Sequence, residues 1–108
     1  MTSKGSFTLS VPEAAFTEAA PVLRVLGHPD RLRIIDVLTR REMPVAELAE
    51  LLNLAPNAVS QHLNMMLARG IVRRNRRGRR VFYEVVHPAA KGLLQCMRRN
   101  ACGGQAGR

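Results

Sequence analysis

Hydrophobic residues recur three or four positions apart in five stretches of the chain, which is the spacing of amphipathic helices. The predicted helices cover residues 10–27, 28–42, 44–53, 56–70 and 87–101. Prolines at positions 29, 44 and 56 suit helix starts, and Gly27 and Gly70 suit helix ends. Ser10 is expected to cap the first helix, and Pro21 is expected to bend it.

One side of each predicted helix is apolar and is expected to face a common core. These inward positions are Phe16, Ala19, Ala20, Leu23 and Leu26; Leu32, Ile35 and Leu38 or their neighbours; Val45, Leu48, Leu51 and Leu52; Val59, Leu63 and Leu67; and Ala90, Leu93, Leu94, Met97 and Ala101. The chain has 108 residues and is 46% hydrophobic, which suffices for one core.

The pattern changes to that of strands after Gly70. The stretches "IVRR" and "RRVFYEVV" flank the turn "NRRG", in which Gly78 supplies the positive φ of a tight hairpin. We therefore predict a mainly α fold with a small β-hairpin (α+β). The domain spans residues 10–101, between a flexible arm at 1–9 and a flexible tail at 102–108.

The fourth predicted helix follows the third after the three-residue turn "NLA", as in a helix-turn-helix. Its outer face lacks carboxylates and carries short polar and amide side chains that suit base edges in a major groove. The candidate DNA-binding residues are Asn57, Ala58, Ser60, Gln61, His62 and Asn64. His62 lies beside this face, where it contacts either a phosphate or the neighbouring helix.

Charge is concentrated in the hairpin. The net charge is +9, and residues 51–83 contain seven arginines and no acidic residue. Such an acid-free block favours a polyanion as partner over an ordinary solvated surface. A hairpin after a recognition helix is a wing, so the candidate phosphate contacts are Arg73, Arg74, Arg76, Arg77, Arg79 and Arg80. We expect Arg76, Arg77 and Arg79, at the tip, to contribute most.

Several classes of protein are disfavoured. No apolar run spans a bilayer, and residues 1–10 lack a secretory signal, which predicts a cytoplasmic protein. No catalytic motif occurs, so we expect no enzyme and no cofactor. Few aromatic residues are available for stacking single-stranded RNA. A nucleoid-type protein that binds DNA without sequence preference is the alternative to a sequence-specific regulator.

The stretches "LGHPDRLRIIDVL", "VAELAELLNLAPNAVSQHLNMMLARGIV" and "RRGRRVFYEV" resemble the successive signatures of the ArsR/SmtB winged helix-turn-helix regulators. This resemblance implies a homodimer formed by the first and last helices, and a repressor of its own operon. It implies a double-stranded operator with two-fold symmetry and, in many members, release by a small inducer. The candidate dimer contacts are Phe16, Leu23, Leu93, Leu94 and Met97.

The resemblance also implies metal sites, which this sequence does not reproduce. Where soft-metal sensors of the family have Cys-Val-Cys, this chain has Pro44, Val45 and Ala46, without a thiolate. Near the C-terminus, His87, Cys96 and Cys102 lack the spacing and carboxylate partner of the second family site, so we predict no metal site.

The remaining candidates are two cysteines and two histidines. Cys96 and Cys102 are candidates for thiol sensing, although a buried Cys96 and an incidental Cys102 are favoured over that role. An intramolecular bridge between them requires the last helix to end before Cys102. His28 and His87 each precede a proline. We expect His28 to begin a helix, and a helix start is the alternative to metal binding for His87.

Overall fold

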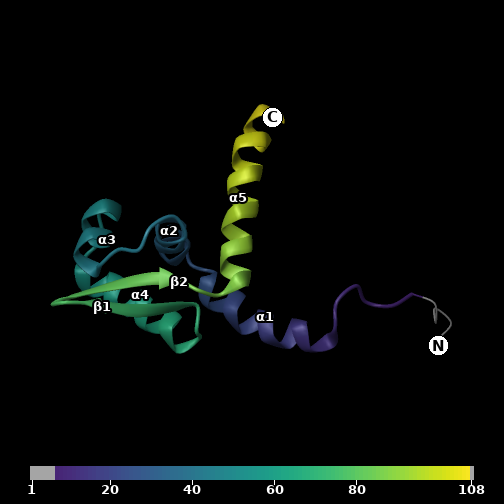
Figure 1. Cartoon of the computed structure of the whole chain (residues 1–108). Coiled ribbons are helices and arrows are strands. Elements are labelled where there is room, and N and C mark those ends of the chain that lie inside the picture. Colours follow the sequence, from purple (N-terminus) through teal and green to yellow (C-terminus); the bar gives the residue numbers. More distant parts are fainter. Residues whose placement is uncertain (1–6, 108) are drawn as a thin grey trace.

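The computed structural model describes residues 7–107, with side chains through residue 101. Five helices and a two-stranded antiparallel hairpin make up this part of the chain (Figure 1). In order they are α1 (Glu13–Leu26), α2 (Pro29–Leu38), α3 (Val45–Leu52), α4 (Pro56–Ala68), β1 (Val72–Arg77), β2 (Arg80–Val85) and α5 (Pro88–Gly107). The fold class predicted from the hydrophobic pattern is confirmed.

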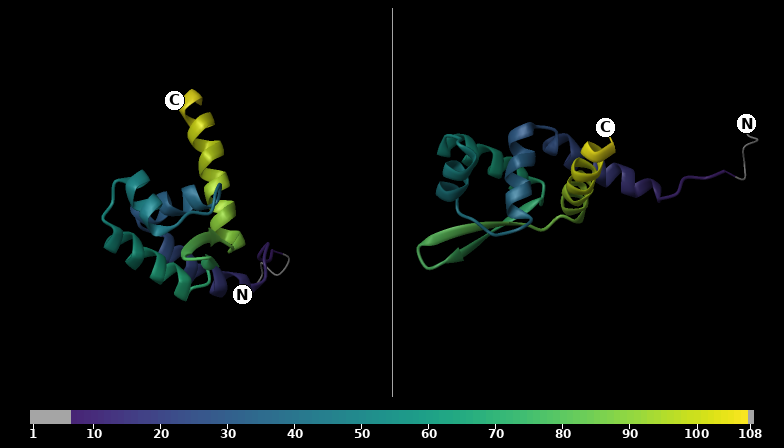
Figure 2. Two further views of the ribbon diagram at one scale, coloured as in Figure 1. Left: turned by 60° about the vertical axis from the view of Figure 1, so that its left-hand side comes forward. Right: turned by 90° about the horizontal axis from the view of Figure 1, so that it is seen from above.

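The elements form two groups. Helices α2, α3 and α4 and the hairpin lie together at one end of the molecule, and α5 packs against the body at its base and projects away from it (Figure 1). Helix α1 lies at the end of the molecule opposite the tip of the hairpin (Figure 2). Helix α5 contacts α1 and α2. The outer ends of α1 and α5 therefore project away from α3, α4 and the hairpin.

The core lies where α2, α3, α4 and the base of the hairpin meet. Ile34, Leu48, Leu63 and Ile71 have no exposed surface. Burying a side chain of this size contributes roughly 1.5–3 kcal/mol. None of the helices in the described part of the chain has the length and apolar character to cross a membrane.

Four predicted inward faces are only partly buried: besides those of α1 and α3, Leu67 of α4 is half-buried, and Met97 and Ala101 of α5 are exposed. In α1 the buried residues are Val22 and Leu26, whereas Phe16 and Leu23 are each 48% exposed. The outer part of α1 projects beyond the body, and none of the residues that the structure describes covers its apolar side fully. In α3, Leu51 is 59% exposed because the face that packs inward is centred on Leu48.

The helix ends differ from the predicted ones at three places, the first being α2, which ends at Leu38 and not at residue 42. Helix α1 begins at Glu13 after Pro12, and no side chain caps it, so the prediction that Ser10 is the cap is wrong. Helix α5 continues to Gly107 instead of ending at Ala101. Extending a formed helix adds a hydrogen bond per residue and costs little, even at Gly103. Flexibility of the tail stays a prediction.

Histidines begin α2 and α5 in the same way. His28 Nδ1 accepts a hydrogen bond from the Asp30 amide at 3.1 Å, and His87 Nδ1 accepts one from the Ala89 amide at 3.1 Å. Each satisfies an amide that the helix leaves open. The structural role predicted for His28 is confirmed, and His87 has the same role.

The hairpin turn lies two residues later than predicted. Gly78 and Arg79 form the turn, Gly78 has a φ of 63°, and Arg77 pairs with Arg80. Asn75 and Arg76 therefore belong to β1. At the other end Val72 and Val85 are buried, and Tyr83 exchanges backbone hydrogen bonds of 3.0 and 3.2 Å with Met43.

Candidate nucleic-acid interface

Helices α3 and α4 are joined by the three residues that the sequence predicts as a turn. Asn53 ends α3 in the left-handed conformation, with φ 57° and ψ 48°, which an asparagine tolerates. The amide of Leu54 donates to the Ala49 carbonyl at 2.9 Å and closes the turn. Leu48 and Val59 are both fully buried and hold the two helices together. The pair has the organisation of a helix-turn-helix.

The inner face of α4 fixes how the helix is rotated. Val59, Leu63 and Met66 have no exposed surface. They lie at i, i+4 and i+7, which is one helical stripe. Met66 takes the innermost position that was predicted for Leu67, and Leu67 is only half-buried. With this stripe inward, the opposite stripe is turned to solvent.

That opposite stripe carries the predicted reading residues. Asn57, Gln61 and Asn64 are exposed, while Ala58 and Ser60 are half-buried. Among the described residues, none of the side chains in this group makes a hydrogen bond within the protein, and the first turn of α4 has no acidic residue. No side chain caps the start of α4. The stripe therefore offers unsatisfied amide donors and acceptors to a ligand.

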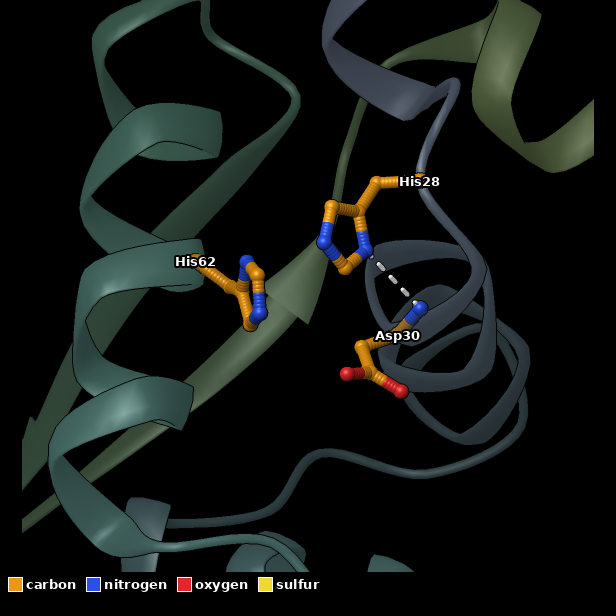
Figure 3. Close-up of side chains that lie close together, drawn as sticks. All are labelled: His28, Asp30 and His62. Atoms are coloured by element: carbon orange, nitrogen blue, oxygen red, sulfur yellow. Dashed lines mark hydrogen bonds between the residues drawn. The ribbon is translucent and has the colours of Figure 1, made fainter.

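The side chain of His62 contacts residues at the start of α2. Its Nδ1 accepts a hydrogen bond from Arg31 Nε at 3.1 Å, and its ring centroid lies 4.7 Å from that of His28 (Figure 3). Arg31 also donates to the Val25 carbonyl at 2.9 Å. Of the two contacts predicted for His62, the structure has the one to the neighbouring helix. This supports the structural alternative for His62, and its role as a DNA contact stays a prediction.

Burial is the main cause that lowers the pKa of His62 below its ordinary value of 6.5. The Coulombic interactions of His62 with His28 and Arg31 lower its pKa further, and that with Asp30 opposes the shift. The neutral ring is thus favoured, which agrees with the acceptor role of Nδ1. His62 links α4 to α2 in its uncharged form.

His28, Asp30 and His62 are the cluster in the described residues that could hold a metal ion, with their ligand atoms within 4.8 Å of one another. Figure 3 shows the three side chains converging from α4 and from the start of α2. Both Nδ1 atoms accept hydrogen bonds, so each neutral ring carries its proton on Nε2. Coordination through Nε2 would move both protons and break both bonds. The cluster is better suited to holding α2 against α4.

Three wing arginines are paired within the protein. Arg73 Nε lies 2.5 Å from Glu84, Arg77 Nη2 lies 2.6 Å from Glu42, and Arg80 Nη2 lies 2.7 Å from Glu47. Alternation along β1 puts residues 73, 75 and 77 on one face of the hairpin, beside the glutamates of the α2–α3 region. We call Arg73, Arg77 and Arg80 the paired arginines.

The other three wing arginines have no acidic partner among the described residues. Arg74 and Arg76 lie on the opposite face of β1, and Arg79 lies in the turn. All three are exposed, and no ion pair or side-chain hydrogen bond engages them among the described residues. We call Arg74, Arg76 and Arg79 the free arginines. The tip set predicted from the sequence differs in one member, because Arg77 is bound to Glu42.

The three glutamates are functional residues that the sequence reasoning missed. Glu84 also accepts from Asn75 Nδ2 at 2.9 Å, and the hydrogen bonds from Asn75 and Arg73 lower the pKa of its carboxyl. Arg77 and Arg80 also lie over the Phe82 ring, at 4.6 and 5.2 Å from its centroid. The signal for Glu84 was the strand register, since a turn at Gly78 places it opposite Arg73.

The candidate dimer residues divide into exposed and buried ones. Phe16, Leu23 and Met97 are 48%, 48% and 41% exposed, while Leu93 is half-buried. Leu94 is only 3% exposed because it packs into the core of its own protomer. Leu94 is therefore corrected to a core residue, and the other four lie on α1 and α5.

Cys96 is exposed and free, so the preference for a buried Cys96 is wrong. Its sulfur accepts a hydrogen bond from Asn100 Nδ2 at 3.3 Å. The side chain of Cys102 lies outside the described residues. Because α5 continues past position 102, the two cysteines are about 9 Å apart along the helix, which is too far for a bridge within one protomer.

A helix-turn-helix with an exposed amide stripe, followed by a basic hairpin, defines a winged helix-turn-helix protein. A helix-turn-helix domain family matches residues 26–75. The chain is 31% identical over 93 residues to the biofilm growth-associated repressor of Agrobacterium fabrum, covering 86% of this chain and 80% of the relative. It is 30% identical to the transcriptional repressor PagR of Bacillus anthracis, covering 72% and 79%.

The fold of a solved relative agrees with these matches. The structure of HlyU from Vibrio cholerae superposes with a TM-score of 0.77 at 28% identity, over 84% of this chain and 99% of that one. The chain belongs to the ArsR/SmtB family of winged helix-turn-helix regulators. It is a DNA-binding transcriptional regulator, which agrees with the prediction that it is not an enzyme.

Proposed function

We propose that the protein is a dimeric repressor of its own operon that binds a double-stranded operator with two-fold symmetry. The observation that carries this proposal is the pairing of two unsatisfied surfaces. One is the amide stripe of α4, and the other is the set of free arginines on the wing beside it. Repressor names among the relatives support the direction of regulation.

In this proposal α4 enters the major groove and the wing follows the phosphates. Gln61 and Asn64 read base edges, Asn57 and Ser60 contact bases or the backbone at the start of the helix, and Ala58 packs against them. The free arginines contact phosphates, which position the protein without reading sequence. A regulator of transcription acts on DNA, so we also propose a cytoplasmic location.

The dimer is proposed from the apolar surface of α1 and α5. Phe16, Leu23 and Met97 are large, exposed and uncovered in the protomer, and Leu93 lies beside them on α5. Exposed apolar patches of this kind mark protein interfaces. Two protomers joined there would present recognition helices to half-sites about 34–36 Å apart.

The test is a gel shift on the DNA upstream of the protein's own gene, compared with a scrambled duplex at several salt concentrations. Tight binding to the upstream fragment and weak binding to the scrambled one supports the proposal. Equal affinity for both would favour the nucleoid-type alternative. The salt series matters because phosphate contacts alone produce strong but unspecific binding at low salt.

The dimer has its own test by light scattering. Leu23→Glu should yield a monomer and weaken operator binding, since each half-site would then be bound alone. Leu51→Glu is the matched control, because Leu51 is a similarly exposed leucine on α3. A dimeric Leu23→Glu variant would contradict the proposed interface.

Relief by a small inducer is the finer part of the proposal. A thiol-reactive inducer would act on Cys96, whose thiol is exposed. Oxidant or persulfide should then weaken operator binding by the native protein and leave the Cys96→Ser variant unaffected. The same result with both proteins would exclude Cys96 as the sensor.

A further inference from the structure

A groove of about 510 Å³ lies between α2, the end of α3 and α5, away from the residues proposed to contact DNA. Its volume falls within the range of roughly 300–1,000 Å³ that is usual for small-molecule sites. The floor is apolar and includes Leu32, Leu51, Leu94 and Met97. Two of these are large apolar side chains exposed in the protomer, Leu51 at 59% and Met97 at 41%, and Met97 is also one of the proposed dimer contacts.

Charged residues along the groove give it an excess of positive charge. Arg33, Arg40 and Arg98 line it together with a single acid, Asp36. Asp30 pairs with Arg33 from outside the groove, at 3.0 Å. Counting both acids against the three arginines still leaves one positive charge. An apolar floor with one surplus cation suits a molecule that has an apolar tail and one negative charge.

The arginines are already held in place. Arg98 Nη2 lies 2.9 Å from Asp36 Oδ1, and Arg40 Nη2 lies 3.1 Å from Asp36 Oδ2. Arg33 Nη2 donates to the Leu52 carbonyl at 2.8 Å. Each guanidinium has five N–H donors, so these contacts leave others for a ligand. Because the side chains are ordered beforehand, a ligand loses less affinity to immobilising them.

We propose that this groove binds an amphipathic monocarboxylate, an aliphatic acid of about eight to ten carbons, with its carboxylate at the arginines and its chain on the leucines. A planar carboxylate matches the donor geometry of a guanidinium. The bound molecule would contact α2, α3 and α5 together. It would therefore connect α3, which precedes α4, with α5, one of the proposed dimer helices. Ligand binding is measured without DNA, so a negative result would leave the proposal of operator binding untouched.

The test is isothermal titration calorimetry of the full-length protein with hexanoate, octanoate and decanoate below the concentrations at which they aggregate. Affinity should rise roughly two- to fourfold per methylene, because each one leaves water. Decyltrimethylammonium, which has the same chain and the opposite charge, should bind at least tenfold more weakly. No heat of binding with decanoate, or equal affinity for the cation, would overturn the proposal.

Matched variants localise the binding. Leu51→Glu puts a carboxylate on the floor and should abolish decanoate binding, whereas Leu9→Glu, at a leucine with 57% exposure outside the groove, should not. Arg40→Gln should weaken binding about fivefold or more, and Arg41→Gln should leave it unchanged. Both leucines are exposed, so folding is preserved, and thermal melts check this. Equal binding by Leu51→Glu and Leu9→Glu would place the ligand elsewhere.

Discussion

Six arginines in one hairpin behave as two groups of three. Two paired arginines face Glu42 and Glu47 beside and on α3, the third faces Glu84 on β2, and each lies within 2.7 Å of a carboxylate. The free arginines face the other way or lie in the turn, without a carboxylate partner in the described part of the chain. The alternation of a strand thus converts a uniform run of charge into one structural face and one face available to DNA.

The difference matters because exchange of partners has a cost. A free arginine gives up only water and counterions when it meets a phosphate. A paired arginine must also leave its glutamate, which costs about 0–1 kcal/mol for an exposed ion pair, and the released carboxylate then repels the phosphate. We therefore expect the paired arginines to add to the field around the wing and the free arginines to make the contacts.

The largest effect is expected from neutralising the free set. The variant Arg74→Gln/Arg76→Gln/Arg79→Gln should lose about two orders of magnitude in operator affinity, because a dimer loses up to six phosphate contacts. The variant Arg73→Gln/Arg77→Gln/Arg80→Gln should lose roughly tenfold or less, through the weaker general field. Fluorescence anisotropy with a labelled operator measures both. Equal losses would remove the distinction between the two faces.

The next prediction separates sequence discrimination by α4 from the overall DNA affinity supplied by the wing. Gln61→Ala should cost about 1–3 kcal/mol of discrimination between the operator and a scrambled duplex, while affinity for the scrambled duplex changes little. The free-arginine variant should lower both affinities by similar factors. Competition binding with both duplexes checks this pattern. A Gln61→Ala variant with unchanged discrimination would place sequence reading elsewhere.

Releasing the paired arginines should have a smaller and opposite effect. Glu42→Gln/Glu47→Gln/Glu84→Gln removes three negative charges and frees three guanidiniums, so affinity for random duplex should rise roughly tenfold. The melting temperature should change little because these ion pairs are exposed. Unchanged affinity would show that the paired arginines cannot reach the backbone even when released.

The smallest effect concerns the attachment of α4 itself. Since the pKa of His62 is lower in the folded protein than its ordinary 6.5, the unfolded chain takes up protons first as the pH falls. The contribution of His62 to stability is therefore present above pH 6.5 and is lost below it, toward the folded pKa. Thermal melts between pH 7.5 and 5.5 should show a larger drop for the native protein than for His62→Gln. A steeper drop in the variant would contradict this.

Much of the fold could be predicted because its signals are local. Pro29, Pro56 and Gly78 act on their own backbone, and Val59 and Leu63 repeat on a stripe that points inward wherever the helix lies. Periodicity alone could not place Phe16, Leu23 and Leu51, since it identifies an apolar face without telling whether the protomer or a partner covers it.

The candidate site was predicted in part for the same reason. The composition of α4 and the wing indicates a polyanion from residue types alone. The partners of Arg77 and Arg80 are Glu42 and Glu47, more than thirty positions away, so no local pattern announces them. The two contacts predicted for His62 could not be ranked from the sequence because its partner, Arg31, is equally remote.

The salt dependence of operator binding tests the division of the wing most directly. For the native dimer and the two triple variants, the slope of log affinity against log salt counts the phosphates neutralised, at about 0.9 per contact. We predict that neutralising the free arginines flattens the slope by up to about 5, and that neutralising the paired arginines flattens it by about 1 or less. A slope that flattens as much for the paired set as for the free set would contradict the account.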